Sequence, residues 1–264
     1  MIDLLESRRM LAVTAVFNAG ALAVTGDAAA NTIDVLVAPG GHISVKSAGT
    51  EIYNSDTNSD VVTGVTITGA AGNDTITLGT NEETFVISVS GDAGNDLITS
   101  SSTHAAGSNV TGGAGADIIK VTNAAGGTGS RIDGGDGNDK ITTTNGLSSD
   151  GSTVTGGAGD DRITAASDTG ATAGHKIRGG DGNDIIHGGA LSDVILGDAG
   201  KDKLFGGDGD DLLFGGDGRD VLRGEAGNDF LDGGANPDTV NGGTDTDTAI
   251  NDKKDTFTDV ENIF

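Results

Sequence analysis

A nine-residue pattern recurs thirteen times between Gly69 and Ile250, and it constrains the fold more than any other feature of this sequence. The pattern is G-G-x-G-x-D-x-U-x, where U is apolar, and every copy keeps aspartate at the sixth place. Clear copies are GGDGNDKIT at 134–142, GGDGNDIIH at 179–187 and GGDGDDLLF at 206–214. Short repeats of this kind form solenoids, in which every unit packs only against its neighbours.

The copies follow two periods. From Gly179 to Gly242 they begin every nine residues, whereas from Gly69 to Gly179 they begin every 21 to 23 residues. We interpret a tandem coil as two nonapeptides and an upstream coil as one nonapeptide plus a half-coil of about 13 residues. Each half of a coil then supplies one short strand with an inward apolar side chain. The sequence therefore predicts an all-β fold, a right-handed parallel β-roll or β-helix solenoid.

In this solenoid the turns stack into two rows. Nine copies, from Gly69 to Gly233, form face A, and four copies, from Gly188 to Gly242, form face B. Upstream, face B consists of longer loops such as SSSTHAAGSN, in which we recognise no ligand pattern. A degenerate copy at 26–34, with Asn31 at the sixth place, lies 43 residues before Gly69 and predicts two further long coils.

The residue types of the repeat favour a hard cation. Calcium takes six to eight oxygen ligands from carboxylates and main-chain carbonyls. Glycine lets a turn adopt positive φ and direct its carbonyls inward. The net charge of −25, from 40 acidic and 15 basic residues, excludes nucleic acid and anionic membrane surfaces as partners. The chain has no cysteine, which excludes thiolate sites, and no apolar run long enough to span a membrane.

The repeat resembles that of the RTX (repeats-in-toxin) family, over roughly residues 69–250. This resemblance implies that calcium ions lie between stacked turns and share carbonyls and sixth-place carboxylates of neighbouring coils. The implied metal ligands are Asp74, Asp96, Asp117, Asp139, Asp161, Asp184, Asp193, Asp202, Asp211, Asp220, Asp229, Asp238 and Asp247. With one ion per gap, eight ions on face A and three on face B give an upper bound of about eleven. Leu191 replaces the fourth glycine of one copy and puts its sites in doubt, because a branched side chain resists positive φ.

The energetics make calcium a candidate folding switch. Carboxylates one coil apart repel one another, while each coil buries only about two aliphatic side chains, worth roughly 1.5 to 3 kcal/mol each. We therefore expect the metal-free array to be marginal or unfolded, and the free energy of calcium binding to drive folding.

We expect four segments. Residues 1–25 form an export-like segment or a solenoid cap, and residues 26–178 a long-coil solenoid with calcium loops on one face. Residues 179–250 form a tandem β-roll with calcium loops on both faces, and residues 251–264 a cap or an export tail.

Both ends allow two interpretations. The start, LLESRRML at 4–11, resembles an element found in many planctomycete surface and secreted proteins. Residues 8–21 also resemble a signal peptide, with Arg8 and Arg9, an apolar run at 10–17 and small residues at 19–21 as a cleavage site. We favour instead two strands around Asn18-Ala19-Gly20 that cap the first coil. The end, 259–264, resembles tails that follow RTX arrays and serve type I export. It is equally suited to cap the last coil, with Ile250, Phe257 and Val260 against the core.

The sequence predicts a protein that is not an enzyme. His42, His104, His175 and His187 are scattered, each expected in a loop or on the solvent face, and no H-E-x-x-H or G-x-S-x-G motif occurs. We expect a secreted, extracellular or cell-surface calcium-binding solenoid with a structural or adhesive role and a polysaccharide or cell-surface partner. The alternative is a carbohydrate-active β-helix enzyme or sugar-binding module, with a groove formed by the long face-B loops around His104, His175 and Lys176.

Overall fold

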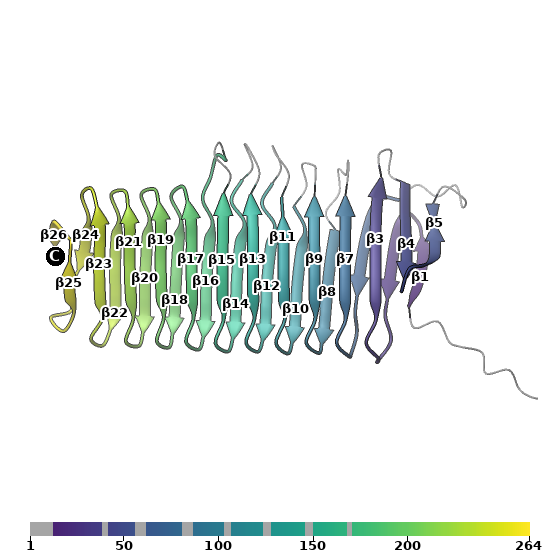
Figure 1. Cartoon of the computed structure of the whole chain (residues 1–264), viewed down its shortest axis with the longest axis horizontal. Coiled ribbons are helices and arrows are strands. Elements are labelled where there is room, and N and C mark those ends of the chain that lie inside the picture. Colours follow the sequence, from purple (N-terminus) through teal and green to yellow (C-terminus); the bar gives the residue numbers. More distant parts are fainter. Residues whose placement is uncertain are drawn as a thin grey trace, which may run out of the picture.

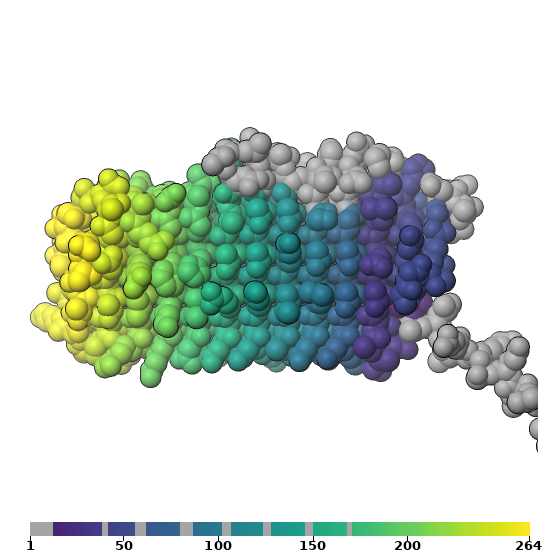
Figure 2. Space-filling view, viewed as in Figure 1, coloured from purple at the N-terminus to yellow at the C-terminus, as the bar shows by residue number. Residues whose placement is uncertain are grey.

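The computed structural model describes residues 13–38, 42–55, 62–80, 87–102, 107–123, 128–145, 150–167 and 171–264. Within these residues, 26 strands form two 13-stranded sheets, and the chain passes from one sheet to the other coil after coil. Figure 1 shows the strands side by side along one long axis, and the space-filling view in Figure 2 shows the rod that results. The predicted parallel β-solenoid is confirmed.

Sheet 1 contains, in spatial order, β1 (Thr14–Asn18), β2 (Ala21–Thr25), β6 (Gly64–Thr68), β8 (Ile87–Ala93), β10 (Asn109–Ala114), β12 (Arg131–Asp136), β14 (Thr153–Ala158), β16 (Lys176–Asp181), β18 (Val194–Ala199), β20 (Leu212–Asp217), β22 (Phe230–Ala235), β24 (Thr248–Ile250) and β26 (Asn262–Ile263). Sheet 2 contains β5 (Thr50–Asn54), β4 (His42–Ser47), β3 (Thr32–Ala38), β7 (Thr75–Thr80), β9 (Leu97–Ser102), β11 (Ile118–Thr122), β13 (Lys140–Asn145), β15 (Arg162–Ser167), β17 (Ile185–Ala190), β19 (Lys203–Asp208), β21 (Val221–Ala226), β23 (Thr239–Thr244) and β25 (Thr256–Thr258). Face-A turns lead from sheet 1 to sheet 2, and face-B turns lead back.

The core lies between the sheets as two ladders of aliphatic side chains. Strand alternation directs the predicted apolar residues inward, and parallel pairing stacks each one on its equivalent in the next coil. In sheet 1, Ile132 pairs with Val154, and in sheet 2, Ile141 pairs with Ile163, all at most 1% exposed. The same register holds from β6 to β22 and from β7 to β23. Every coil therefore repeats the same cross-section.

The 43-residue interval before Gly69 is one coil, so the prediction of two was wrong. Strand β3 pairs directly with β7, with Ile33 beside Ile76. The additional residues contain β4 and β5, which continue sheet 2 beyond β3 in antiparallel pairs. Antiparallel strands need only a tight turn, here at Ala48 and Gly49 with positive φ. An inserted hairpin therefore mimics the spacing of an additional coil.

Both ends close on the solenoid. The expected N-terminal strands are present as the β1–β2 hairpin, which turns at Ala19 and Gly20 and joins sheet 1 through β2. The LLESRRML element lies outside the described residues. At the other end, β25 pairs with β23 and β26 with β24, and Phe257 and Val260 pack partly buried against the core. The tail thus lies where a cap would lie, while an export role stays a prediction.

Candidate metal sites in the turns

All thirteen sixth-place aspartates are buried, with at most 3% of each residue exposed. Each of them directly precedes a strand of the next sheet, and each stacks on its equivalent in the neighbouring coil. On face A, the Asp139 N–H donates to Asp161 Oδ1 at 2.8 Å, and on face B, the Asp193 N–H donates to Asp211 Oδ1 at 2.7 Å. The same bond recurs along both faces. The aspartates therefore form two carboxylate ladders.

The second oxygen of every ladder carboxylate is unsatisfied. In all thirteen residues Oδ2 is buried and accepts no hydrogen bond. A buried acceptor without a partner is costly, and native proteins rarely leave one. Thirteen such oxygens at one place in the repeat indicate a ligand that supplies positive charge.

The first glycine of the repeat gathers a second oxygen at the same point. A Cβ added to Gly134 would lie closer than 3.0 Å to both Asp139 Oδ2 and the Gly156 carbonyl oxygen of the next coil. Only a residue without a side chain fits between them. The same pair of oxygens surrounds Gly69, Gly91, Gly112, Gly134, Gly156, Gly179, Gly197 and Gly215 on face A, and Gly188, Gly206 and Gly224 on face B. Carboxylate and carbonyl oxygens are the donor set of calcium, so these residues fit the ion.

Main-chain oxygens must supply most of the ligands. Within the described ranges, no three histidine, aspartate or glutamate side chains converge on one point. The ladder carboxylates are separated by one coil, about 4.8 Å. Turn glycines such as Gly135 and Gly137 have φ of 107° and 128°, values that glycine adopts without strain.

Burial makes these carboxylates resist ionisation in the absence of a cation. The pKa of Asp161 is raised to about 7, chiefly by desolvation. The hydrogen bond from the Asp139 N–H opposes this rise, and the charges of Asp184 and Asp139 add to it. Burial likewise raises the pKa of Asp193 and Asp211 to about 7. A bound cation would remove this cost, because it stabilises the charged form.

A family model described as RTX calcium-binding nonapeptide repeat (4 copies) matches residues 65–81, 149–169, 178–213, 187–222 and 214–249. The chain therefore carries RTX calcium-binding nonapeptide repeats over these residues. No curated protein matches it significantly. RTX repeats bind calcium and are typically non-catalytic, so the fold and the family together support a calcium-binding structural protein.

One RTX copy tests how strictly the turn geometry is kept. Leu191 adopts a φ of 72° at the fourth place. This value is similar to the φ of Asn236 (85°) and Asp245 (84°), which occupy the fourth place in other copies. The turn keeps its path, and the strain of positive φ falls on a branched residue. Weaker calcium binding at this copy stays a prediction.

Upstream of the tandem RTX copies, face B carries a serine ladder that the sequence did not indicate. The Ser108 N–H donates to Ser130 Oγ at 3.0 Å, and the Ser130 N–H donates to Ser152 Oγ at 3.2 Å. All three are at most 4% exposed, and Asn123 and Asn145 bond to their hydroxyls. The serine hydroxyls thus accept the same ladder hydrogen bond as the aspartate Oδ1 atoms, but they carry no charge. Serines spaced 22 residues apart were the available signal.

His175 joins the serine ladder to the aspartate ladder on face B. It is 1% exposed, its N–H donates to Asp193 Oδ1, and its ring Nε2 lies 3.2 Å from Ser167 Oγ. The expectation of a histidine in a loop, on the solvent face or in a groove was therefore wrong for His175, because the ladder position points inward. His187 stacks on Phe205 with ring centroids 4.4 Å apart, and His104 lies outside the described residues.

The carboxylate ladders also extend beyond the thirteen copies. The Asp238 N–H donates to Asp255 Oδ1 at 2.9 Å, and the Asp247 N–H donates to Glu261 Oε2 at 2.8 Å. The segment INDKKDTFT at 250–258 is a degenerate further copy, with Lys253 at a φ of 74° in the fourth place. It was missed because its aspartate follows Asp238 by 17 residues instead of 18 and its glycines are lost.

Proposed function

We propose that this protein is secreted or held at the cell surface, folds on binding calcium, and has a structural or adhesive role. The unsatisfied Oδ2 atoms of the thirteen ladder aspartates carry this proposal. A site that exists only in the folded state converts binding free energy into folding free energy. We propose these thirteen aspartates, with the turn carbonyls, as the calcium ligands.

The location follows from affinity. RTX repeat proteins are typically secreted or extracellular. Extracellular calcium modules bind with dissociation constants of about 10⁻⁴ to 10⁻³ M, so their sites stay empty in the cytosol and fill outside the cell. No helix among the described residues is long and apolar enough to cross a membrane. We propose that the chain is exported unfolded and folds outside.

Circular dichroism with EDTA, followed by millimolar CaCl₂, tests the folding switch. We expect a disordered spectrum that converts to a β spectrum, and native mass spectrometry should show many ions per chain. Magnesium at the same concentration is the control, because it keeps its octahedral hydration and suits carbonyl-rich sites poorly. A β spectrum that is the same in EDTA and in calcium would refute the proposal.

For the polysaccharide partner, the outer face of sheet 2 offers a contact surface, which we call the basic face. Its outward strand positions from β9 to β23 contain Lys120, Lys140, Arg162, Lys203 and Arg223, and the one acidic residue among them is Glu225 of β21. None of these cations pairs with a carboxylate among the described residues. An unpaired basic row on an otherwise acidic chain favours an anionic polymer.

Binding to a polyuronate, measured with calcium present, tests the basic face. Reversing charge in Arg162→Glu and Lys140→Glu should weaken binding at low ionic strength, while Arg131→Glu on the outer face of sheet 1 should leave it unchanged. Equal binding by all variants would exclude the basic face, and release of shorter sugars by the pure protein would instead favour the carbohydrate-active alternative.

A further inference from the structure

The last repeat of face B, which begins at Gly242, has both of the oxygens that mark a site, although no further repeat follows it on face B. Asp247 is fully buried, and its Oδ2 has no hydrogen-bond partner. A Cβ added to Gly242 would lie closer than 3.0 Å both to this oxygen and to the carbonyl oxygen of Asp259. In the three preceding face-B copies the second oxygen belongs to the first glycine of the next repeat. The Asp259 carbonyl therefore takes the place of a repeat carbonyl.

We propose that the tail residues 259–261 complete one more calcium site, which we call the tail site, between the Gly242–Asp247 turn and the end of the chain. The inference rests on the proposed calcium binding and adds a twelfth site to the eleven that the repeats provide. Its ligands would be the Asp247 carboxylate and the Asp259 carbonyl, with Glu261 beside them.

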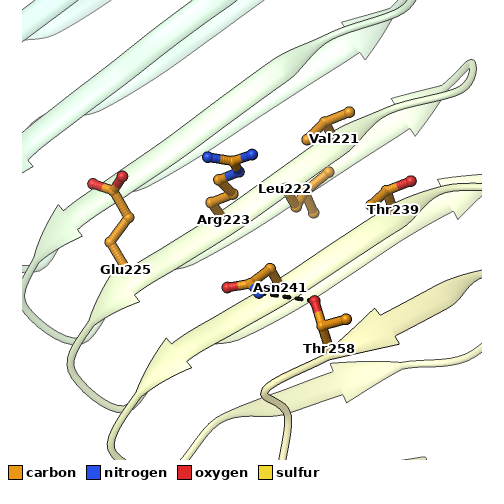
Figure 3. Close-up of a pocket in the computed structure, with 7 residues that line it drawn as sticks. All are labelled: Val221, Leu222, Arg223, Glu225, Thr239, Asn241 and Thr258. Atoms are coloured by element: carbon orange, nitrogen blue, oxygen red, sulfur yellow. Dashed lines mark hydrogen bonds between the residues drawn. The ribbon is translucent and has the colours of Figure 1, made fainter.

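Strand β23 of the preceding coil holds the tail in position. Asn241 of β23 donates from Nδ2 to Thr258 Oγ1 at 2.8 Å, the bond drawn in Figure 3, and to Asp259 Oδ2 at 2.9 Å. The Gly243 N–H donates to the Asp259 carbonyl at 3.2 Å, and one carbonyl oxygen has a second lone pair for a cation. Asp259 itself has a φ of 50°, the left-handed conformation that repeat turns use at their fourth place. These contacts fix the carbonyl beside Gly242 before any ion binds.

Glu261 supplies the carboxylate that a following repeat would have supplied. Its Oε2 accepts from the Asp247 N–H, as the sixth-place Oδ1 does throughout the ladder. The glutamate reaches this position from a tail with a different backbone, because its side chain is one methylene longer than that of aspartate. The tail site therefore keeps the charge of a repeat site without its glycines.

Face A ends differently. Asp255 continues its hydrogen-bond ladder, yet the three atoms nearest to a Cβ added at Gly233 all belong to Asp238. No carbonyl of the following turn approaches that point as Asp259 approaches Gly242. The inference is therefore restricted to face B.

Counting calcium ions per chain by native mass spectrometry tests the tail site. We expect Gly242→Ala to bind one ion fewer than the wild type at the same free calcium, because its Cβ would occupy the space between the two oxygens. Gly64→Ala is the matched control, since an added Cβ there meets nothing within 4 Å, and it should bind the wild-type number.

A second variant covers the case in which Gly242→Ala does not fold. Glu261→Gln retains an acceptor oxygen for the Asp247 N–H and removes the charge, so it should fold and lose the last ion at a higher free calcium concentration than the wild type does. Amide hydrogen exchange of 259–264 should be slowed by calcium in the wild type and faster in Glu261→Gln, with Asp252→Asn as the charge-matched control.

The outcomes separate the two proposals. A wild type that binds calcium and folds, with Glu261→Gln unchanged in ion number and in tail exchange, would overturn the tail site alone. A wild type that binds no calcium would overturn the proposed function itself.

Discussion

Face B is built in two ways within one molecule. From β10 to β14 its turns are linked by serine hydroxyls, and from β18 to β24 by aspartate carboxylates, with His175 at the change. Both provide an acceptor for the N–H of the preceding coil, so the backbone stacks equally well. The hydroxyl leaves nothing unsatisfied, whereas the carboxylate leaves one buried oxygen. The calcium dependence that we propose is therefore a property of the side chain at one ladder position and not of the solenoid fold.

Removing calcium should have the largest effect and should act unequally on the two regions. At a tenfold excess over the dissociation constant each bound ion contributes about 1.4 kcal/mol, and the tandem region has proposed calcium sites on both faces. As free calcium is lowered, we expect residues 179–250 to lose amide protection before residues 107–167. Hydrogen exchange measured by mass spectrometry across a calcium titration would show this order, and simultaneous loss would contradict the comparison.

Acid should partly replace calcium in the tandem region. Burial raises the pKa of Asp193 and Asp211 to about 7 and that of Asp229 to about 6, above the ordinary value of 3.8. The folded state then holds protons that the unfolded state releases, so the metal-free fold is stabilised below about pH 4 and loses that stability as pH rises to about 7. Circular dichroism in EDTA at pH 5 and pH 8 measures the difference, and we expect the larger β signal at pH 5. Greater stability at pH 8 would reverse the expected sign.

Removing one carboxylate should have opposite effects with and without calcium. Asp211→Asn keeps an acceptor for the Asp193 N–H but removes a charge. In calcium we expect fewer bound ions and a loss of about 1.4 kcal/mol for each. In EDTA at pH 8 we expect a gain in stability, because a buried charge is gone. Thermal unfolding in calcium, and the β content measured by circular dichroism in EDTA, test this, with the exposed Asp210→Asn as control. A loss of stability both in calcium and in EDTA would contradict the claim that the buried carboxylate destabilises the metal-free fold.

Removing one serine hydroxyl should change stability by an amount that does not depend on calcium. Ser130→Ala leaves the buried N–H of Ser108 without its acceptor, which costs roughly 1 to 3 kcal/mol. Urea unfolding should show the same loss in calcium and in metal-free buffer at a pH where the protein is folded. A loss that appears only in calcium would mean that the serine ladder also holds ions.

The fold was readable from the sequence because its signals are local and repeated. Ile141 and Ile163 mark the same inward position in successive coils, and parallel pairing places them together. The serine ladder left only a weak signal, the 22-residue spacing of Ser108, Ser130 and Ser152, because serine is common in loops and becomes a ladder only through the pairing of distant coils. The inserted segment that contains β4 and β5 made the predicted number of coils wrong, because it lengthens one coil by 21 residues, from the usual 22 to 43. The ladder positions of Asp255 and Glu261 were not predicted, because the repeat spacing changes and the turn glycines are lost where the array ends.

The constant register along both sheets also determines how such a chain can change in length. Duplicating one complete coil returns every downstream strand to the same sheet and every ladder residue to the same face, so no other contact alters. A duplication of nine residues moves each downstream turn to the opposite face. In the tandem region both faces carry aspartate, and that exchange keeps the ladders intact. In the long-coil region a nine-residue duplication would move aspartates into the serine ladder of face B. That part of the molecule can therefore be lengthened only by whole coils.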